Sequence, residues 1–536
     1  MQLPQTRSSR ALWRVLVLGI LFSVLPLSAA TTLLARPLWL RAPAASQKAQ
    51  TTETWMGLYM GSRKVGYAHL QTLPATYQGK PALRSISKSV TKLTVLGSAV
   101  EQEESQETLS DLRYQPLEQT FNIKSNGSAI QLTATYDYAA HKVTCRLNTG
   151  GAQTTKTLTI PKDAVLAGDT NFLTAGQPLS VGQKLSFYFL NPLNVELEEA
   201  KVEVAGRETL KDAVSGKMAP TFVIKAHLSL GDMTSWETED GDTLKNEMSL
   251  AGITLTMLKE PQAVALNPEA QPLPAPGASN SGGTAYTPPA DFAVATAIGT
   301  DRPIQDARNV RALTVTIAGV PEKRFVLSDD RQRAEILPVA NALAGYTVRY
   351  DIRATPFEAA NAARLPITDP ALKPYLWKAA YLDTSDVNIR STAARLRGKE
   401  KNLYRIAVRI RDWVHKNMRP DASIGVPRSA SDIFLRRRGV CRDYATFYTA
   451  LARAAGVPTR LCGGIVYAED KFFYHAWAES YVGQWVAFDP TLPAPSGAEP
   501  FVDATHIKFT QGDPMGMFRV VGIVGKLHIT VQDFAL

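Results

Sequence analysis

The sequence predicts a multidomain protein in which an N-terminal antiparallel β domain precedes a C-terminal α+β core. The chain has 536 residues, and at roughly 100–200 residues per domain it is long enough for several domains. Residues 51–262 contain short runs rich in Val, Thr, Tyr and Leu between turn residues, a pattern typical of antiparallel strands. From residue 370 the apolar residues instead recur at steps of three and four, which is the period of a helix.

The composition is that of a chain that folds in water. Hydrophobic residues make up 45% and charged residues 20%, which excludes wholesale disorder, a collagen-like repeat and a multi-span membrane protein. Three cysteines are too few for a disulfide scaffold. Lys and Arg number 59 against 49 Asp and Glu, and the resulting net charge of +10 suits anionic surroundings.

Residues 1–45 are predicted to target the chain for export. Arginines up to Arg14 precede an uncharged stretch over residues 15–35, and Ser28-Ala29-Ala30 offers the small residues of a signal-peptidase site. The same stretch is long enough to cross a bilayer core of about 30 Å, so a cleaved signal peptide and an uncleaved transmembrane anchor both remain open. Either places the remaining chain in the periplasm or cell envelope of a bacterium.

The N-terminal elements follow from turn chemistry. Within residues 51–262, Asn126-Gly127 between two alternating runs predicts a β-hairpin, because both residues accept the positive φ angles of a type I′ turn. The opening strand around Trp55 and the closing segment from Trp236 to Gly241 are expected at edges of the sheet. Residues 263–290, rich in Pro, Ala and Gly, are predicted to be a linker, and residues 291–366 a small β-rich region that flanks the core.

Residues 367–536 are predicted to form the core with C-terminal strands. Helices are expected over residues 399–418, 431–437 and 441–455, and strands over residues 463–468, 473–482 and 485–488. Cys441 then lies on the first turn of a helix, His475 on a strand and Asp489 at the end of the neighbouring strand.

These three side chains suit nucleophilic catalysis. A helix N-terminus favours the thiolate, which is the nucleophilic form of cysteine. A histidine can act as base, and a carboxylate can orient the imidazole. Cys441, His475 and Asp489 are therefore the candidate catalytic residues.

Four motifs in the same order resemble those of the transglutaminase-like superfamily. They are Arg438-Gly439-Val440-Cys441-Arg442-Asp443-Tyr444-Ala445, Ala455-Gly456-Val457-Pro458-Thr459-Arg460, His475-Ala476-Trp477-Ala478-Glu479 and Phe488-Asp489-Pro490-Thr491. The resemblance covers about residues 370–515. It implies a papain-like α+β core with Cys441 as nucleophile, His475 as general base and acid, and Asp489 as the residue that holds the imidazole. It also implies acyl transfer from an amide of a peptide or protein through a thioester to an amine or water, without a cofactor or metal.

Several alternatives remain open. Taken singly, each of the three residues could be structural: a buried cysteine, a core histidine and a turn aspartate. The domain could also be a thiol protease of the cell envelope, or a non-catalytic peptide-binding or assembly module that keeps the fold. A zinc site of Cys441, Cys462, His475 and Asp489 is disfavoured because the sequence has no close ligand pair such as C-x₂-C. Calcium activation is not supported, because no ligand loop is present.

Other polar residues near these motifs have structural interpretations. Cys145 is expected in the core of the β domain. Cys462 is expected to be buried, although a disulfide with Cys441 would make activity redox-dependent. Asp443 and Glu479 are expected to be polar residues of a helix end and a strand rather than catalysts.

The basic charge is concentrated in the predicted core. Residues 390–460 contain 17 Lys or Arg and 5 Asp or Glu. This excess is either an ordinary solvated helix surface or a surface that attracts an acidic substrate or the anionic envelope. Nucleic acid is not expected as a partner, because no recognition motif is present.

Strand parity makes a geometric prediction. A two-residue loop after the His475 strand would place Asp489 on the opposite face of the sheet. A three-residue loop, Val482-Gly483-Gln484, pairs Tyr481 with Trp485 and brings Asp489 to the same face as His475. We therefore expect the odd-length loop.

Overall fold

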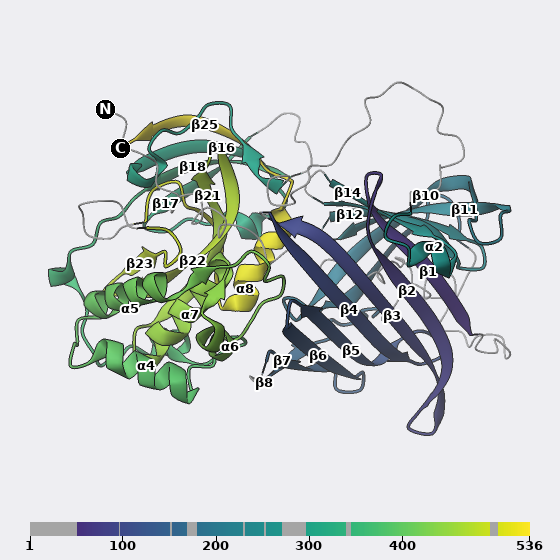
Figure 1. The fold of residues 1–536 in the computed structure, drawn as a ribbon, viewed down its shortest axis with the longest axis horizontal. Helices are drawn as coiled ribbons and strands as arrows, with labels where there is room; N and C mark the ends of the chain where they lie inside the picture. The colour runs from purple at the N-terminus through teal and green to yellow at the C-terminus, as the bar shows by residue number, and fades with distance from the viewer. Residues whose placement is uncertain are drawn as a thin grey trace.

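The computed structural model describes residues 51–95, 97–150, 153–168, 179–228, 231–250, 253–270, 296–338, 345–493 and 502–536. The predicted targeting segment, residues 1–45, lies outside the described residues, as does most of the predicted linker, residues 263–290. Where the chain is described, no helix is both long and apolar enough to cross a membrane. Figure 1 shows two parts, a large β-sheet on the right and an α+β core on the left.

The N-terminal part is one antiparallel sheet of fourteen strands in the order β8-β7-β6-β5-β4-β3-β2-β1-β14-β13-β12-β11-β10-β9. Alternate residues along many of these strands are buried, as expected when one face of a sheet covers a core. The strands are β1 (Thr52–Met60), β2 (Arg63–Tyr77), β3 (Lys80–Val95), β4 (Ser98–Ser110), β5 (Pro116–Ser125), β6 (Ser128–Asp137), β7 (Lys142–Asn148), β8 (Gln153–Thr159), β9 (Lys184–Asn191), β10 (Glu196–Lys211), β11 (Met218–Leu228), β12 (Gly231–Thr238), β13 (Thr243–Leu250) and β14 (Ile253–Lys259).

Two predictions about this sheet have different outcomes. The hairpin is confirmed: Ser125 pairs with Ser128, and Asn126 and Gly127 have φ angles of 44° and 79°. Both predicted edge positions are wrong. β1 pairs with β2 on one side and with β14 on the other, and β12, which carries Trp236, pairs with β11 and β13. The β1–β14 pairing joins the two ends of the domain sequence, and local patterns do not report so distant a partner.

The core contains a five-stranded sheet covered by helices. Its order is β15-β22-β21-β24, with β23 paired to β22. The predicted apolar period is confirmed in α5, whose residues Leu403, Ile406 and Ile410 are fully buried. The helices are α2 (Gln262–Ala265, beside the large sheet), α4 (Val387–Arg397), α5 (Leu403–Asn417), α6 (Ala430–Arg436), α7 (Cys441–Ala454) and α8 (Pro514–Phe518), and the strands are β15 (Ile298–Gly299), β21 (Thr459–Ala468), β22 (Lys471–Tyr481), β23 (Trp485–Phe488) and β24 (Ile507–Gly512).

A second core sheet joins two distant parts of the chain. It has the order β17-β18-β16-β25 and contains β16 (Ala312–Val320), β17 (Gln332–Leu337), β18 (Tyr346–Arg353) and β25 (His528–Ala535). The region predicted to flank the core, residues 291–366, thus shares a sheet with the C-terminal strand. β15 also places this region beside β22, the strand that carries His475.

The large sheet contacts the core near the helix that carries Cys441. At the tip of the β5–β6 hairpin, the Asn126 side chain donates to the carbonyl of Ser423, and Arg436 donates to the carbonyl of Gly127 at 3.1 Å. Elsewhere Glu196 of β10 forms an ion pair with Arg519. The hairpin tip therefore lies against the segment that leads into α7, where β19 (Arg419–Pro420) and β20 (Arg438–Gly439) pair.

Candidate active site

Cys441 is held at the start of α7 by its neighbours. The Asp443 carboxylate accepts a hydrogen bond from the Val440 N–H at 3.0 Å, which caps the first turn. A side chain at position 439 would collide with this carboxylate, since a Cβ built on Gly439 would lie 2.4 Å from Oδ2 of Asp443. Cys441 has 2% of its surface exposed. The helix start thus fixes the thiol in a tightly packed place.

Arg442 anchors the same turn from the other side. Its fully buried guanidinium donates to the carbonyls of Ile424 at 3.1 Å and Val426 at 2.6 Å, and it lies 3.6 Å from Asp443. Asp443 also faces Arg428 at 3.4 Å. The assignment of Asp443 as a helix-end residue therefore agrees with its contacts.

The register prediction for the hairpin after His475 is confirmed. Tyr481 pairs with Trp485, which leaves Val482, Gly483 and Gln484 as a three-residue loop. Gly483 has a φ of 124°, a conformation that favours glycine. The consequence is the expected one: Nε2 of His475 donates to Oδ2 of Asp489 at 2.8 Å.

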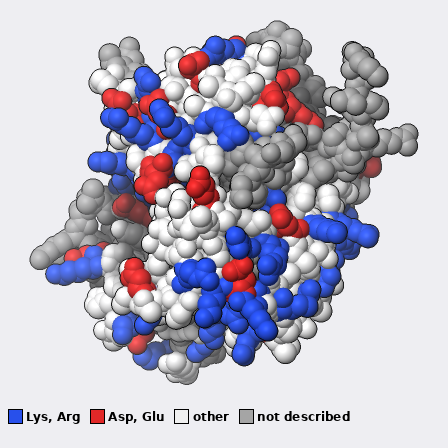
Figure 2. All heavy atoms as spheres, turned by 90° about the vertical axis from the view of Figure 1, so that its left-hand side faces the viewer, with Lys and Arg blue, Asp and Glu red and all other residues white. Residues whose placement is uncertain are grey.

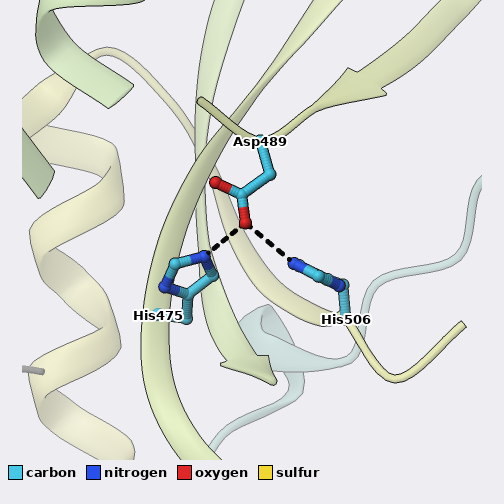
Figure 3. Close-up of side chains that lie close together, drawn as sticks. All are labelled: His475, Asp489 and His506. Atoms are coloured by element: carbon cyan, nitrogen blue, oxygen red, sulfur yellow. Dashed lines mark hydrogen bonds and ion pairs between the residues drawn. The ribbon is translucent and has the colours of Figure 1, made fainter. Parts of the chain in front are cut away.

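A second histidine, which the sequence analysis missed, contacts the same carboxylate oxygen. Nε2 of His506 donates to Oδ2 of Asp489 at 3.2 Å, and Figure 3 shows both imidazoles directed at this one atom. The other oxygen, Oδ1, accepts the backbone N–H of Thr491 at 2.7 Å and that of Leu492 at 3.3 Å. Four donors therefore fix the carboxylate. No motif marks His506, and its position just before β24 is the one sequence signal that could have pointed to it.

Burial and the neighbouring charges shift the pKa values of His475 and Asp489 in opposite directions. Burial disfavours the charged form of His475, but the charge and hydrogen bond of Asp489 and an interaction with Cys441 outweigh it, so the pKa of His475 is raised. Burial also opposes ionisation of Asp489, yet His475 and His506 hold the pKa of this carboxyl well below its ordinary value. Because Nε2 of His475 serves Asp489, Nδ1 is the nitrogen left for the thiol of Cys441.

The other two cysteines lie in separate surroundings. All three cysteines are buried and none of them is in a disulfide, and Cys145 is 1% exposed in the core of the large sheet. Cys462 is fully buried, and burial together with the nearby Glu479 raises the pKa of its thiol well above the usual range. Glu479 itself pairs with Arg460 at 2.7 Å and Lys508 at 2.6 Å. Cys462 and Glu479 thus belong to a buried ionic cluster rather than to the Cys441 site.

The side chains that lie together in the structure differ from those of the predicted zinc site. Among the described residues, the side chains that could share a metal ion are His475, Asp489 and His506, a set without Cys462. In the structure, Nε2 of His475 and Nε2 of His506 each lie at hydrogen-bond distance from Oδ2 of Asp489, at 2.8 and 3.2 Å. Hydrogen bonding accounts for this cluster.

The basic residues of the 390–460 stretch lie partly on the surface and partly in the interior. Arg428, Arg442 and Arg453 are buried, whereas others lie on the surface, and Figure 2 shows Lys and Arg gathered on the lower part of the core face. The exposed ones are Arg390, Arg395, Lys399, Lys401, Arg405, Arg409, Lys416, Arg419, Arg436 and Arg438.

The α+β core has the arrangement of a nucleophile, a base and an orienting group. These are a cysteine on a helix start, a histidine on a strand and a carboxylate at the end of the next strand. Residues 390–490 match the family model of the transglutaminase-like superfamily, and this stretch is therefore transglutaminase-like, as the four motifs predicted. Residues 55–245 match a family described as a protein of unknown function, DUF3108. None of the curated proteins compared with this chain matches it.

Solved structures resemble parts of the chain. A candidate cysteine protease from Cytophaga hutchinsonii is 20% identical, with 42% of this chain and 86% of that chain covered and a TM-score of 0.28. A β-barrel-like protein of the family DUF1849 from Brucella abortus is 11% identical, with 40% and 96% covered and a TM-score of 0.30. A candidate protease from Parabacteroides distasonis is 11% identical, with 73% and 68% covered and a TM-score of 0.19.

Proposed function

We propose that the protein is an exported cysteine enzyme that cleaves amide bonds of peptides or proteins and passes the acyl group to an amine or to water. The observation that carries this proposal is the hydrogen bond between His475 and Asp489 beside Cys441 at the start of α7, inside a transglutaminase-like core. Cys441 is the proposed nucleophile, His475 the base and acid, and Asp489 the orienting carboxylate.

The proposed reaction has two balanced halves. The Cys441 thiolate attacks the amide carbonyl carbon, and the His475 imidazolium gives its proton to the departing amine, which leaves a thioester and a neutral imidazole. In the second half, His475 takes a proton from the incoming amine or water, which attacks the thioester and releases the Cys441 thiolate. The interaction of His475 with both Asp489 and Cys441 supports these roles, because it holds one imidazole nitrogen for each partner.

The proposed location of the enzyme is the cell envelope. A targeting segment at residues 1–45 would place the core in the cell envelope, where peptides and proteins are available as substrates. The exposed basic residues of α4, α5 and the loop between them would attract the core to the anionic envelope surface. Sedimentation with phosphatidylglycerol vesicles tests this attraction: Lys399→Glu with Lys401→Glu should weaken it, and raised salt should weaken it further.

The direct test compares envelope peptides from cells that carry the natural chain with those from cells that carry Cys441→Ala. Mass spectrometry should find a product, either a cleaved amide or a new amide linkage, that disappears in the variant. Added amine should convert a hydrolytic product into a transfer product if water and amines compete for the thioester. Cys462→Ala is the matched control, since it removes a buried thiol of the same core that lies outside the proposed site.

Two outcomes would count against the proposal. Unchanged envelope peptides, together with retention of peptides on both the natural chain and Cys441→Ala, would favour the non-catalytic binding module. Cleavage that persists in Cys441→Ala would show that the nucleophile lies elsewhere.

A further inference from the structure

The carboxylate of Asp489 receives two imidazole donors at a single oxygen. His475 and His506 both donate to Oδ2, at 2.8 and 3.2 Å, while Oδ1 is occupied by backbone N–H groups. His506 is 1% exposed, and its ring lies 5.5 Å from the ring of His475, centroid to centroid. A buried imidazole in this position cannot be an incidental surface contact. It is one of the four donors to the carboxylate that faces His475.

The region before β18 holds the backbone around His506. The Arg331 guanidinium donates to the carbonyl of His506 at 2.6 Å and also to that of Asp503. The Gln332 amide both donates to the carbonyl of Lys508 and accepts its N–H, each at 2.8 Å. These contacts hold the chain both before and after His506.

The second nitrogen of His506 faces another fixed carboxylate. Nδ1 lies 3.4 Å from Oδ1 of Asp503, and Asp503 is paired with Arg308 at 2.9 Å. Arg308 also donates to the Thr505 hydroxyl at 3.0 Å. The imidazole therefore lies between two carboxylates, one of which is anchored to the same small β region.

We propose that His506 is a positioning residue for the catalytic centre, and that residues 308–332 hold it against Asp489 so that the carboxylate presents a fixed and partly shared charge to His475. This inference rests on the proposed function. It assigns a role to the region between the linker and the core, which supplies Arg308, Arg331 and Gln332 without contributing a reacting atom.

The shared oxygen has a consequence for the acid–base behaviour of the site. Each donor takes part of the negative charge of Asp489, so removal of the His506 donor leaves more of it for His475. A more stable His475 imidazolium supports the Cys441 thiolate, and the thiolate then persists to lower pH. The charged and titratable groups facing this network include Cys441 and Arg442 on α7, His475 on β22, Asp489 after β23, Asp503 and His506 before β24, Arg308 before β16, Arg331 before β17 and Arg411 on α5.

The test measures alkylation of Cys441 by iodoacetamide in the full chain from pH 5 to 10, with mass spectrometry of the Cys441 peptide. His506→Phe keeps a buried ring but lacks the donor, whereas the amide nitrogen of His506→Gln can donate in place of Nε2. The alkylation midpoint should move to lower pH by roughly half a unit or more in His506→Phe, and His506→Gln should return it toward the natural value.

Two further variants keep the result interpretable. Val466→Ala, at a fully buried position on β21, controls for lost stability. Cys441 of an unfolded chain reacts as an ordinary thiol with a pKa of about 8.5, so unfolding by itself does not produce a midpoint at lower pH. Arg331→Met releases the backbone of His506, and should shift the midpoint in the same direction but less. If His506→Phe does not fold, Arg331→Met and His506→Gln still test the inference.

The outcomes distinguish a failure of the positioning role of His506 from a failure of the proposed function. An unchanged midpoint in both His506→Phe and Arg331→Met, or an equal shift in His506→Gln, would overturn the positioning role. His475→Ala should strongly slow alkylation of Cys441 at pH 7. If it does not, the proposed function itself fails, whereas a response to His475→Ala alone would leave that function intact and reject the role of His506.

Discussion

The large sheet and the core each contain a histidine bonded to a carboxylate at the same distance. His69 and Glu53 are 2.8 Å apart in the sheet, and His475 and Asp489 are 2.8 Å apart in the core. The side chains of the first pair are 19% and 51% exposed, and those of the second pair 0% and 5%. Water screens the first pair, so its contribution to stability is small. The comparison shows that burial and neighbouring groups, rather than the hydrogen bond alone, distinguish a candidate active site.

Two buried glutamates extend the comparison. Glu237 in the sheet is 2% exposed and accepts from the Ser235 hydroxyl at 2.8 Å, and burial raises its pKa to about 7. Glu479 in the core is 4% exposed, but Lys508 and Arg460 outweigh the effect of burial and lower its pKa. The sheet thus buries a carboxyl group that is neutral below about pH 7, whereas the core buries a carboxylate compensated by cations.

The largest expected effect separates the two histidine pairs. His475→Ala should reduce formation of the product identified by the envelope comparison by on the order of 10⁵-fold, because nucleophile and base act as a unit. Adding Cys441→Ala should reduce it little further. His69→Ala removes the equivalent hydrogen bond in the sheet and should leave product formation unchanged. Additive losses in the double variant would contradict the assignment of Cys441 and His475 to one catalytic unit.

The next effect concerns the stability of the core. Glu479→Gln removes the carboxylate between Arg460 and Lys508 and leaves two buried cations without it. Removing one partner of a buried ion pair costs about 3–5 kcal/mol. Lys508 retains Asp329 at 2.5 Å, so the cost falls mainly on Arg460. Hydrogen exchange of β21 and β22 peptides in the full chain should become faster, while exchange in β1–β8 serves as the internal reference. Unchanged exchange would mean that the cluster contributes no net stability.

A glutamate-to-glutamine substitution at the buried Glu237 of the sheet should stabilise the fold instead of destabilising it. An unfolded glutamate ionises above about pH 4.3, whereas folded Glu237 stays protonated up to about pH 7. The unfolded state therefore binds fewer protons in this interval, and stability falls as the pH rises. Glu237→Gln should protect β12 by about 3–4 kcal/mol at pH 8 and by almost nothing near pH 4. Hydrogen exchange of the β12 peptide at both pH values measures this, and equal effects at the two would refute it.

The smallest effect tests the contact between the two regions. Arg519 pairs with Glu196 of β10, and the two side chains are 40% and 24% exposed. Because solvent screens such a pair, Arg519→Ala should cost less than about 1 kcal/mol. Thermal unfolding of the full chain, compared with that of Glu196→Ala and the double variant, gives the coupling energy. A coupling of several kcal/mol would show that the regions stabilise each other strongly through this pair.

The sequence alone determined the local architecture and the three candidate catalytic residues. The alternation of residues 51–262 predicted the antiparallel sheet, and the apolar period predicted α5 and α7 to within a few residues. The parity of β22 and β23 predicted that His475 and Asp489 share a face. Each of these inferences depends on neighbours within about 20 residues along the chain, where spacing directly sets geometry.

Only the tertiary structure decided which distant segments complete the fold and the site. β1 lies beside β14, and β25 lies beside β16. His506 contacts Asp489, while Arg331 bonds the His506 carbonyl, Arg308 the Thr505 hydroxyl and Gln332 the Lys508 N–H. A single histidine or arginine has no periodicity, so the sequence does not show its partners. Its partners are set by folding, because polar groups that are buried away from water must be paired with donors and acceptors in the protein. That pairing depends on the packed interior, which local sequence patterns do not encode.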